Sequence, residues 1–382
     1  MEFIEIKVQL FLKAFQFLLV KFEPVKLKDI AKALNLSTAT VSRALRGCYQ
    51  ISEKTKDLVV EYATKMNYRP NPIALGLKEK RTNAIGVLVP EIANNFFSQA
   101  INGIESYAHQ KGYQIIITQS HESHGREQLN ARYLASRGID GLLVSLSSES
   151  ANIDYLKELH GKGLPLVFFD RISDQINTHK VIADNYSGSF NGTEHLLSQG
   201  YKRIALIAGP PHLSITKERL EGYKNALAEY GISFDEQLVK YCQHAGMIIE
   251  EVHAALNDVL FACTKADAIF TTAYRLTTVC LGLLKSRLSV EIGFLGFTNT
   301  LLGDLFSSAL TVIRQPAFEI GQHAIELLIG IVESRKPVTD FKTISLDTKL
   351  IIRESSLSKC VIQSCKKTEK RNSLLHKKKI VL

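Results

Sequence analysis

Residues 27–46 read Leu-Lys-Asp-Ile-Ala-Lys-Ala-Leu-Asn-Leu-Ser-Thr-Ala-Thr-Val-Ser-Arg-Ala-Leu-Arg. The first half predicts a short amphipathic helix, because its apolar residues recur at helical spacing, at Leu27, Ile30, Ala31 and Leu34. Asn35-Leu36-Ser37 then interrupts the period, and the Ser37 hydroxyl stands where it can cap a second helix. The stretch therefore predicts two short helices separated by a tight turn.

The second helix has an apolar face and an opposite face that is free to make contacts. Val41, Ala44 and Leu45 point inward, and the other face carries Thr38, Ala39, Ser42, Arg43 and Arg46. A third helix, capped by Ser52, is expected to close the core with Leu58, Val59, Tyr62, Ala63 and Met66. This pattern is typical of a helix-turn-helix, whose second helix enters the DNA major groove by its N-terminal end. A plain helical bundle with solvated lysines is the alternative.

Positive charge is concentrated in two segments of the 382-residue chain. Residues 24–82 hold 12 basic and 5 acidic side chains, and residues 353–382 hold 9 and 2. Residues 83–352 hold 23 basic and 28 acidic side chains. An acidic body with basic flanks indicates contact with a polyanion, either nucleic acid or an anionic membrane.

A membrane role has little support in the sequence. Leu10–Phe22 is apolar, but Lys13 and Lys21 interrupt it and leave far fewer than the ~20 uncharged residues that a span needs. No small-residue cleavage site follows, so no secretory leader is expected. The six cysteines include no Cys-x-x-Cys pair, which favours a reduced, cytoplasmic setting.

Several short phrases of this sequence closely resemble the headpiece of the LacI/GalR (lactose-repressor) family. They are Asp29-Ile30-Ala31, Ser37, Thr40-Val41-Ser42-Arg43-Ala44-Leu45 and Asn67-Tyr68-Arg69-Pro70-Asn71, and the resemblance continues from about residue 25 to about 354. It implies a homodimeric transcriptional regulator that binds near-palindromic double-stranded operator DNA. Ser37 and Thr40 would then contact phosphates and Thr38, Ala39 and Arg43 base edges, with Ser42 and Arg46 in the same interface.

Residues 71–82 match the hinge helix of this family, which orders on operator DNA and packs against its dimer mate in the minor groove. Leu77 corresponds to the family's leucine that wedges between base pairs, which kinks DNA by unstacking one step. Ala74 lies one turn back on the same face, and Lys78 is placed to meet phosphate or the groove floor. Without DNA the same residues can be read as a flexible linker.

From residue 84 onward, short apolar runs alternate with helical segments, which implies parallel sheets covered on both faces. The expected strands are 84–89, 113–118, 141–145, 164–169, 181–183, 203–208, 268–271 and 291–296. The expected helices are 96–111, 124–137, 150–161, 187–199, 216–230, 247–262 and 275–286. Such length predicts two subdomains with a ligand at the carboxyl ends of the strands. The predicted fold class is an all-α helix-turn-helix headpiece plus an α/β core of two parallel-sheet subdomains like that of periplasmic binding proteins.

Residues at strand ends match effector-contact positions of the family. They are Phe96, Phe97, Asp170, Arg171, Arg219, Thr298 and Gln315. The fork of Arg219 can take two vicinal hydroxyls or a carboxylate. Asp170 and Gln315 can equally be read as strand-end caps.

The sequence departs from the family pattern at two places in this site, so the chemical identity of the ligand stays open. Ala273-Tyr274 replaces the family's Asn-Asp, and Thr298 stands where the family has an aspartate that binds a hydroxyl group. A small polar effector is expected, and a sugar is one possibility.

Other chemistry is not supported. The sequence has no Gly-x-Gly-x-x-Gly, no phosphate-binding Gly-x-x-x-x-Gly-Lys-Ser/Thr and no Gly-x-Ser-x-Gly elbow, so no enzyme, cofactor or catalytic residue is expected. His121-Glu122-Ser123-His124 is read as an exposed polar loop and not as a metal site. A periplasmic-type sugar-binding protein without a regulatory role is the alternative function.

The expected domain boundaries divide the chain into five segments. Residues 1–24 form an N-terminal extension, 25–70 the helix-turn-helix domain, 71–82 the hinge, 83–354 the effector-binding and dimerisation domain, and 355–382 a disordered basic tail. The tail could add nonspecific DNA affinity, or it could be a solvated segment without a role.

Replacement of Leu77 by Ala should reduce the bend of operator DNA, because a methyl group is too short to hold a base step open. The bend angle can be measured by gel phasing or by FRET between labelled DNA ends. An unchanged angle in Leu77→Ala argues against the wedge.

Overall fold

The computed structural model describes residues 25–68, 81–261, 265–285, 292–300 and 309–358. In the first unit of the fold, the described residues form three short helices. They are α2 (Leu27–Ala33), α3 (Thr38–Leu45) and α4 (Glu53–Lys65). Asn35 takes the left-handed backbone conformation (φ 51°) in the turn, and the Ser37 hydroxyl accepts a 3.0 Å hydrogen bond from the Thr40 amide. The predicted helix-turn-helix geometry is therefore confirmed.

Fewer side chains are buried in the core of this unit than the sequence predicted. Ile30, Val41 and Val59 are fully buried, but Leu58 and Met66 are 49% and 40% exposed. Their predicted burial was wrong because three short helices cover only one stripe of α4, and Val59 occupies that stripe.

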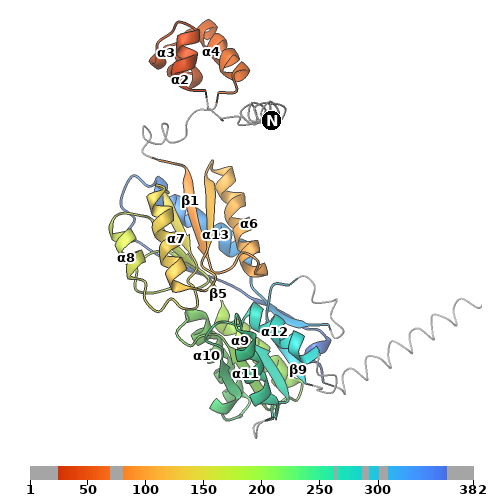
Figure 1. Ribbon diagram of the computed structural model, residues 1–382. Helices are drawn as coiled ribbons and strands as arrows, with labels where there is room; N and C mark the ends of the chain where they lie inside the picture. Colours follow the sequence, from red (N-terminus) through yellow and green to blue (C-terminus); the bar gives the residue numbers. More distant parts are fainter. Residues whose placement is uncertain (1–24, 69–80, 262–264, 286–291, 301–308, 359–382) are drawn as a thin grey trace, which may run out of the picture. The chain divides into compact units, whose positions relative to one another are not determined.

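The second unit begins at Asn83 and contains two six-stranded sheets. The first sheet has the order β11-β5-β4-β3-β1-β2 and is parallel throughout. Its strands are β1 (Ala84–Val89), β2 (Gln114–Gln119), β3 (Gly141–Val144), β4 (Leu166–Phe169), β5 (Lys180–Ala183) and β11 (Thr343–Leu346). It is covered by α6 (Asn95–Gln110) and α13 (Ala317–Glu333) on one face and by α7 (His124–Ser136) and α8 (Asp154–Gly161) on the other (Figure 1).

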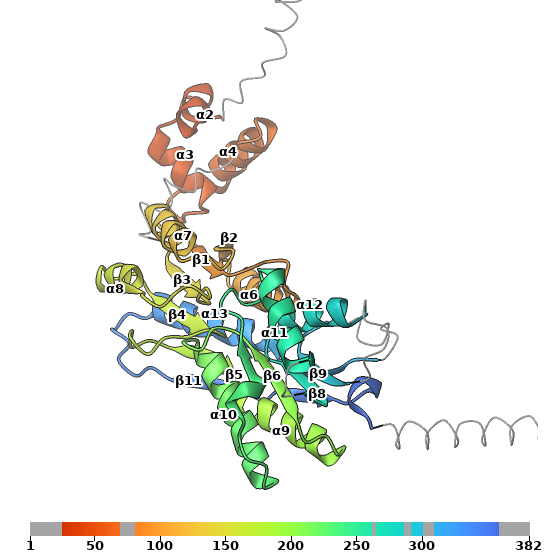
Figure 2. The same ribbon diagram turned by 60° about the horizontal axis from the view of Figure 1, so that its bottom comes forward.

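The second sheet has the order β12-β10-β9-β8-β6-β7, in which only the edge strand β12 is antiparallel. Its strands are β6 (Ile204–Ala208), β7 (Val239–Tyr241), β8 (Ala268–Thr271), β9 (Gly293–Phe297), β10 (Thr311–Arg314) and β12 (Lys349–Ile351). It is covered by α9 (Asn185–Ser198) and α10 (Ser214–Glu229) on one face and by α11 (Ile249–Phe261) and α12 (Tyr274–Lys285) on the other (Figure 2). The predicted class of two mostly parallel subdomains is confirmed.

The chain crosses between the two subdomains three times. The crossings lie between β5 and α9, between β10 and α13, and between β11 and β12. The first subdomain is therefore completed by α13 and β11, which come late in the sequence and were not predicted. Neither subdomain is a continuous stretch of chain.

The body continues past residue 354, where the basic tail was expected to begin. The short 3-10 helix Glu354–Ser356 packs on the second subdomain, and the Ser355 hydroxyl donates to the Phe294 carbonyl at 2.7 Å. Ser356 is fully buried and its hydroxyl lies 2.7 Å from His195 Nε2. The predicted tail after residue 358 and the extension 1–24 lie outside the described residues.

Helices α6 and α13 approach so closely that each needs a glycine at the contact. A Cβ at Gly321 would lie 2.0 Å from the Ala100 carbonyl oxygen, and one at Gly103 would lie 2.0 Å from the Phe318 oxygen. These two helices, far apart in sequence, therefore form one tightly packed layer on the first sheet.

Substitution of Gly321 by Ala should destabilise the protein by about 2–3 kcal/mol, because the methyl group would displace backbone of α6. Gly330→Ala is the matched control in the same helix, since a Cβ at that position meets nothing within 4 Å. The control should be neutral or stabilising by up to ~1 kcal/mol. Urea unfolding measures both, and equal midpoints for the two variants would refute the packing argument.

Candidate nucleic-acid interface and ligand site

The exposed face of α3 carries the predicted DNA contacts. Thr38, Ala39 and Arg43 are exposed, and the Ser37 and Thr40 hydroxyls lie 2.8 Å apart at the N-terminal end of the helix. Arg46 bends back, so that its Nε donates to the Ser42 carbonyl at 3.0 Å and its Nη2 to the Ser42 hydroxyl at 3.3 Å. Among the described residues, the Arg43 guanidinium makes no hydrogen bond, so it is less constrained on this face than that of Arg46. The hinge residues Ala74, Leu77 and Lys78 lie outside the described residues.

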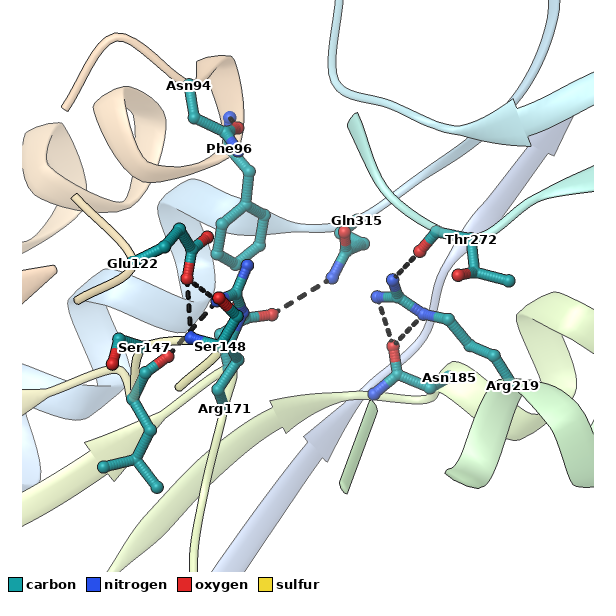
Figure 3. A network of polar contacts seen from close by, with 12 residues as sticks. Asn94, Phe96, Glu122, Ser147, Ser148, Arg171, Asn185, Arg219, Thr272 and Gln315 are labelled. Carbon is teal, nitrogen blue, oxygen red and sulfur yellow. Dashed lines mark hydrogen bonds and ion pairs between the residues drawn. The ribbon is translucent and has the colours of Figure 1, made fainter. Parts of the chain in front are cut away.

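At the carboxyl edge of the first sheet, Arg171 is buried and paired. Its Nη1 donates to Glu122 Oε2 at 2.7 Å and to the Leu146 carbonyl at 3.3 Å, and its guanidinium lies 5.9 Å from the centre of the Phe97 ring (Figure 3). Glu122 also accepts a 2.7 Å hydrogen bond from the Ser148 amide. The segment 121–124, expected to be an exposed loop, therefore supplies a largely buried carboxylate, and this interpretation of the sequence was wrong.

Burial and charge act in opposite directions on the ionisable groups of this edge. Burial raises the pKa of Asp170 above its ordinary value, although Arg171 and Arg219 counteract the shift. Burial alone would lower the pKa of Arg171, but the Glu122 carboxylate raises it. Asp170 also takes the left-handed backbone conformation (φ 59°), which is uncommon for a residue with a side chain. The charge of Arg171 is thus compensated inside the protein.

Gln315 links the two subdomains at one crossing. Its Nε2 donates to Asp170 Oδ1 at 3.4 Å, and its backbone amide donates to Asn299 Oδ1 at 3.0 Å. Thr298 is buried, but its hydroxyl accepts the Thr300 amide at 3.2 Å within its own loop. The structure therefore joins Asp170, Arg171 and Gln315 in one network, whereas the Thr298 hydroxyl bonds within its own loop.

Arg219, on α10, is the centre of a second buried network, in the second subdomain. Its Nε and Nη2 both donate to Asn185 Oδ1, at 2.9 and 2.6 Å, its Nη1 donates to the Thr272 carbonyl, and its guanidinium stacks 3.8 Å above the Phe297 ring (Figure 3). Burial lowers the pKa of Arg219 to about 10. The guanidinium N–H groups that were expected to bind a ligand therefore donate to Asn185 and Thr272 instead. Only one N–H group on Nη1 and one on Nη2 remain for a ligand.

Phe96 and Phe97 begin α6 directly after the loop that follows β1. Their rings meet edge to face at 5.2 Å, and Asn94 Oδ1 caps the helix by accepting the Phe96 amide at 3.0 Å. Both rings are buried, at 5% and 2% exposure. Figure 3 shows Phe96 above Arg171, on the side toward Gln315.

Several polar atoms at these strand ends are buried without a hydrogen-bond partner in the described part of the chain. They are Arg171 Nε and the hydroxyls of Ser120, Ser145, Ser148 and Ser214. Ser120 and Ser145 directly follow β2 and β3, and Ser214 begins α10. Because unpaired buried polar groups are costly, this region is suited to a polar ligand that supplies the missing partners.

The sequence reasoning missed Glu122, Asn185, Thr272 and Asn299. Each follows a strand at its carboxyl end, as Asp170 does. The same rule that selected Asp170 could have selected them.

A three-helix DNA-binding headpiece joined to a two-subdomain binding body defines a class of ligand-responsive regulators. The family model of bacterial regulatory proteins of the lacI family matches residues 26–71. The model of periplasmic binding proteins and the sugar binding domain of the LacI family matches residues 82–354. The chain therefore belongs to the LacI family of transcriptional regulators, and the alternative of a binding protein without a regulatory headpiece is excluded.

The chain is similar to several repressors over almost their whole length. It is 30% identical over 335 residues to the repressor CytR of Escherichia coli, covering 86% of this chain and 96% of the relative. It is 28% identical over 336 residues to the ribose operon repressor of Halalkalibacterium halodurans, covering 86% and 96%. It is 27% identical over 339 residues to the repressor PurR of Vibrio vulnificus, covering 86% and 98%.

Solved structures agree on the fold. The lac repressor dimer bound to operator and the anti-inducer ONPF matches with a TM-score of 0.73 at 23% identity, covering 88% of this chain and all of the other. The complex of the regulator CelR with cellobiose matches with a TM-score of 0.63 at 25% identity, covering 87% and 99%.

Two features are absent from the described residues. No helix among them is both long and apolar enough to cross a bilayer. No group of three or more potential metal ligands is found in the same residues.

Substitution of Glu122 by Gln should destabilise the protein by about 3 kcal/mol, because the buried Arg171 charge would lose its carboxylate while the shape of the side chain is kept. Urea unfolding measures the loss. Glu158→Gln is the control, because its ion pairs with Arg132 and Lys162 are exposed, and it should leave stability unchanged. Equal losses of stability in the two variants would show that the buried ion pair stabilises the protein no more than the exposed one.

Proposed function

We propose that this protein is a homodimeric transcriptional repressor that binds a near-palindromic operator and changes its affinity when a small polar ligand binds the body. Two headpieces related by a two-fold axis would read the two half-sites. The ligand class includes sugars. The protein would act in the cytoplasm, on the nucleoid, and no catalytic activity is assigned to it.

For DNA binding, the observation that carries the proposal is the exposed face of α3. The side chains of Thr38, Ala39 and Arg43 project from a well-packed helix, and the Arg43 guanidinium makes no hydrogen bond or ion pair with any other described residue. A free guanidinium on such a helix suits a guanine edge, and Ala39 can offer only apolar contact, for example to a thymine methyl group. Ser37 and Thr40 would position the helix on phosphates.

For the ligand, the proposal rests on the buried polar atoms that have no hydrogen-bond partner among the described residues, on Arg171, Ser145 and Ser148 in the first subdomain and on Ser214 in the second. Asp170, Arg171 and Gln315 are the candidate contacts on one side and Arg219 and Thr298 on the other, with Phe96 and Phe97 as the apolar wall. Arg171 is already neutralised by Glu122, so an uncharged ligand with several hydroxyl groups fits better than an anion. Ser145 and Ser148 join the candidate set, because their hydroxyls are buried and unpaired among described residues.

Ligand binding would act on DNA through the arrangement of the subdomains. Residues 71–82 would carry that change to the headpiece as the hinge, and Leu77, Ala74 and Lys78 would form its DNA contacts. A ligand can shift this equilibrium only by its different affinity for the two arrangements, and by linkage the operator must change ligand affinity equally. Residues 25–70 would bind DNA, and the body that begins at residue 83 and continues past residue 354 would bind the ligand and form the dimer.

Replacement of Arg43 by Ala should reduce discrimination between operator and random DNA about 5- to 150-fold, because a bidentate base contact contributes about 1–3 kcal/mol of discrimination. Genome-wide mapping of bound DNA supplies the operator, and fluorescence anisotropy then gives both dissociation constants. Lys65→Ala is the control with the same charge change, and it should weaken both affinities alike or leave them unchanged. Retained discrimination in Arg43→Ala would falsify its base-reading role.

A further inference from the structure

An ion pair joins the two subdomains away from the candidate ligand contacts. Glu91 lies in the loop after β1, in the first subdomain, and Arg275 is the second residue of α12, in the second subdomain. Arg275 Nη2 contacts Glu91 Oε1, and the two side chains are only 32% and 17% exposed. Partial burial reduces the screening of this pair by salt compared with a pair at the open surface.

An amide pair makes a second direct bond between the subdomains. Gln99 on α6 donates from Nε2 to the Asn299 carbonyl at 3.2 Å, and Asn299 Nδ2 donates back to Gln99 Oε1 at 2.9 Å. Asn299 Nδ2 also donates to the Gln315 carbonyl at 2.8 Å, at the crossing into α13. One side chain thus ties α6, the loop after β9 and a crossing segment together.

We propose that Glu91–Arg275 and Gln99–Asn299 form a latch that holds the two subdomains in this arrangement without any ligand. Each contact joins groups of different subdomains, so a rotation that separates these groups breaks both contacts. Contacts present in only one of two arrangements raise the population of that arrangement. A ligand that needs the latched arrangement would then bind with an apparent affinity set in part by the latch.

The ion pair of the latch is separate from the site that the ligand would occupy. Neither Glu91 nor Arg275 is among the candidate ligand contacts, so loss of this pair changes the equilibrium between arrangements and not the contacts to ligand. Asn299, by contrast, also bonds to the candidate contact Gln315. A role of the latch in DNA binding rests on the proposed function. Its effect on the arrangement of the two subdomains does not.

The latch can be tested in the full-length protein by electron–electron resonance distance measurement. Nitroxides are attached to ketone-bearing amino acids at the exposed positions Ser136 on α7 and Glu250 on α11, and labelled chains are diluted with unlabelled ones. Neither ligand nor operator is added. The wild-type chain should give one dominant distance.

Glu91→Gln and Arg275→Gln should each shift the ratio of the two arrangements about fivefold toward a second distance. The exchanged pair Glu91→Arg with Arg275→Glu should restore most of the first distance. Lys180→Gln is the control, because it removes a partly buried ion pair with Asp174 inside one subdomain, and it should leave the distances unchanged. Unchanged distances in both single variants, no recovery in the exchanged pair, or an equal shift in the control would each overturn the latch.

Operator affinity of the same variants separates the two claims. If the distances shift and operator affinity shifts with them, the latch controls DNA binding. If the distances shift and operator affinity does not, the latch stands and the proposed coupling between body and headpiece fails.

Discussion

Two buried guanidinium groups, one in each subdomain, are the constraint around which the body is organised. A charge out of water is tolerated only where hydrogen bonds and opposite charge replace the lost solvation. Arg171 obtains them from Glu122 and the Leu146 carbonyl, and Arg219 obtains them from Asn185, Thr272 and the Phe297 ring. Each arginine therefore fixes several loops at the carboxyl ends of its sheet. The candidate ligand site is the region where these two fixed sets of loops face each other.

The crossings of the chain make this region sensitive to how the subdomains are arranged. Gln315 lies in one crossing and bonds to Asp170 on one subdomain and Asn299 on the other. Helix α13 follows Gln315 directly and packs on α6 through glycine contacts. A displacement of Gln315 would therefore also move α13 and α6. A ligand that supplies partners to the buried hydroxyls on both sides would favour one arrangement, which is how binding in the body can reach the DNA-binding unit.

Much of the fold could be predicted from the sequence because its elements have strong local signals. The Ser37 cap, the turn at Asn35 and the strand Ala84–Val89 were all predicted and are present. Helix α13 was missed although its buried residues keep a clear helical period, whereas the edge strands β11 and β12 are short and only half-buried and give little signal. In the candidate site, the sequence predicted polar side chains at the ends of strands, but it did not predict which of these side chains bond to each other. No local pattern shows that Glu122 neutralises Arg171 across 49 residues or that Asn185 occupies the fork of Arg219.

The central claim is that one ligand site in the body and the operator site in the headpiece are thermodynamically coupled. A thermal-shift screen of sugars and nucleosides on the full-length protein would select a compound that stabilises the body. Its effect on the operator Kd, and the effect of the operator on the compound's own Kd, are then measured by fluorescence anisotropy and calorimetry. The account predicts the same factor in both directions, about 5- to 150-fold. Stabilising compounds that leave the operator Kd unchanged would contradict it.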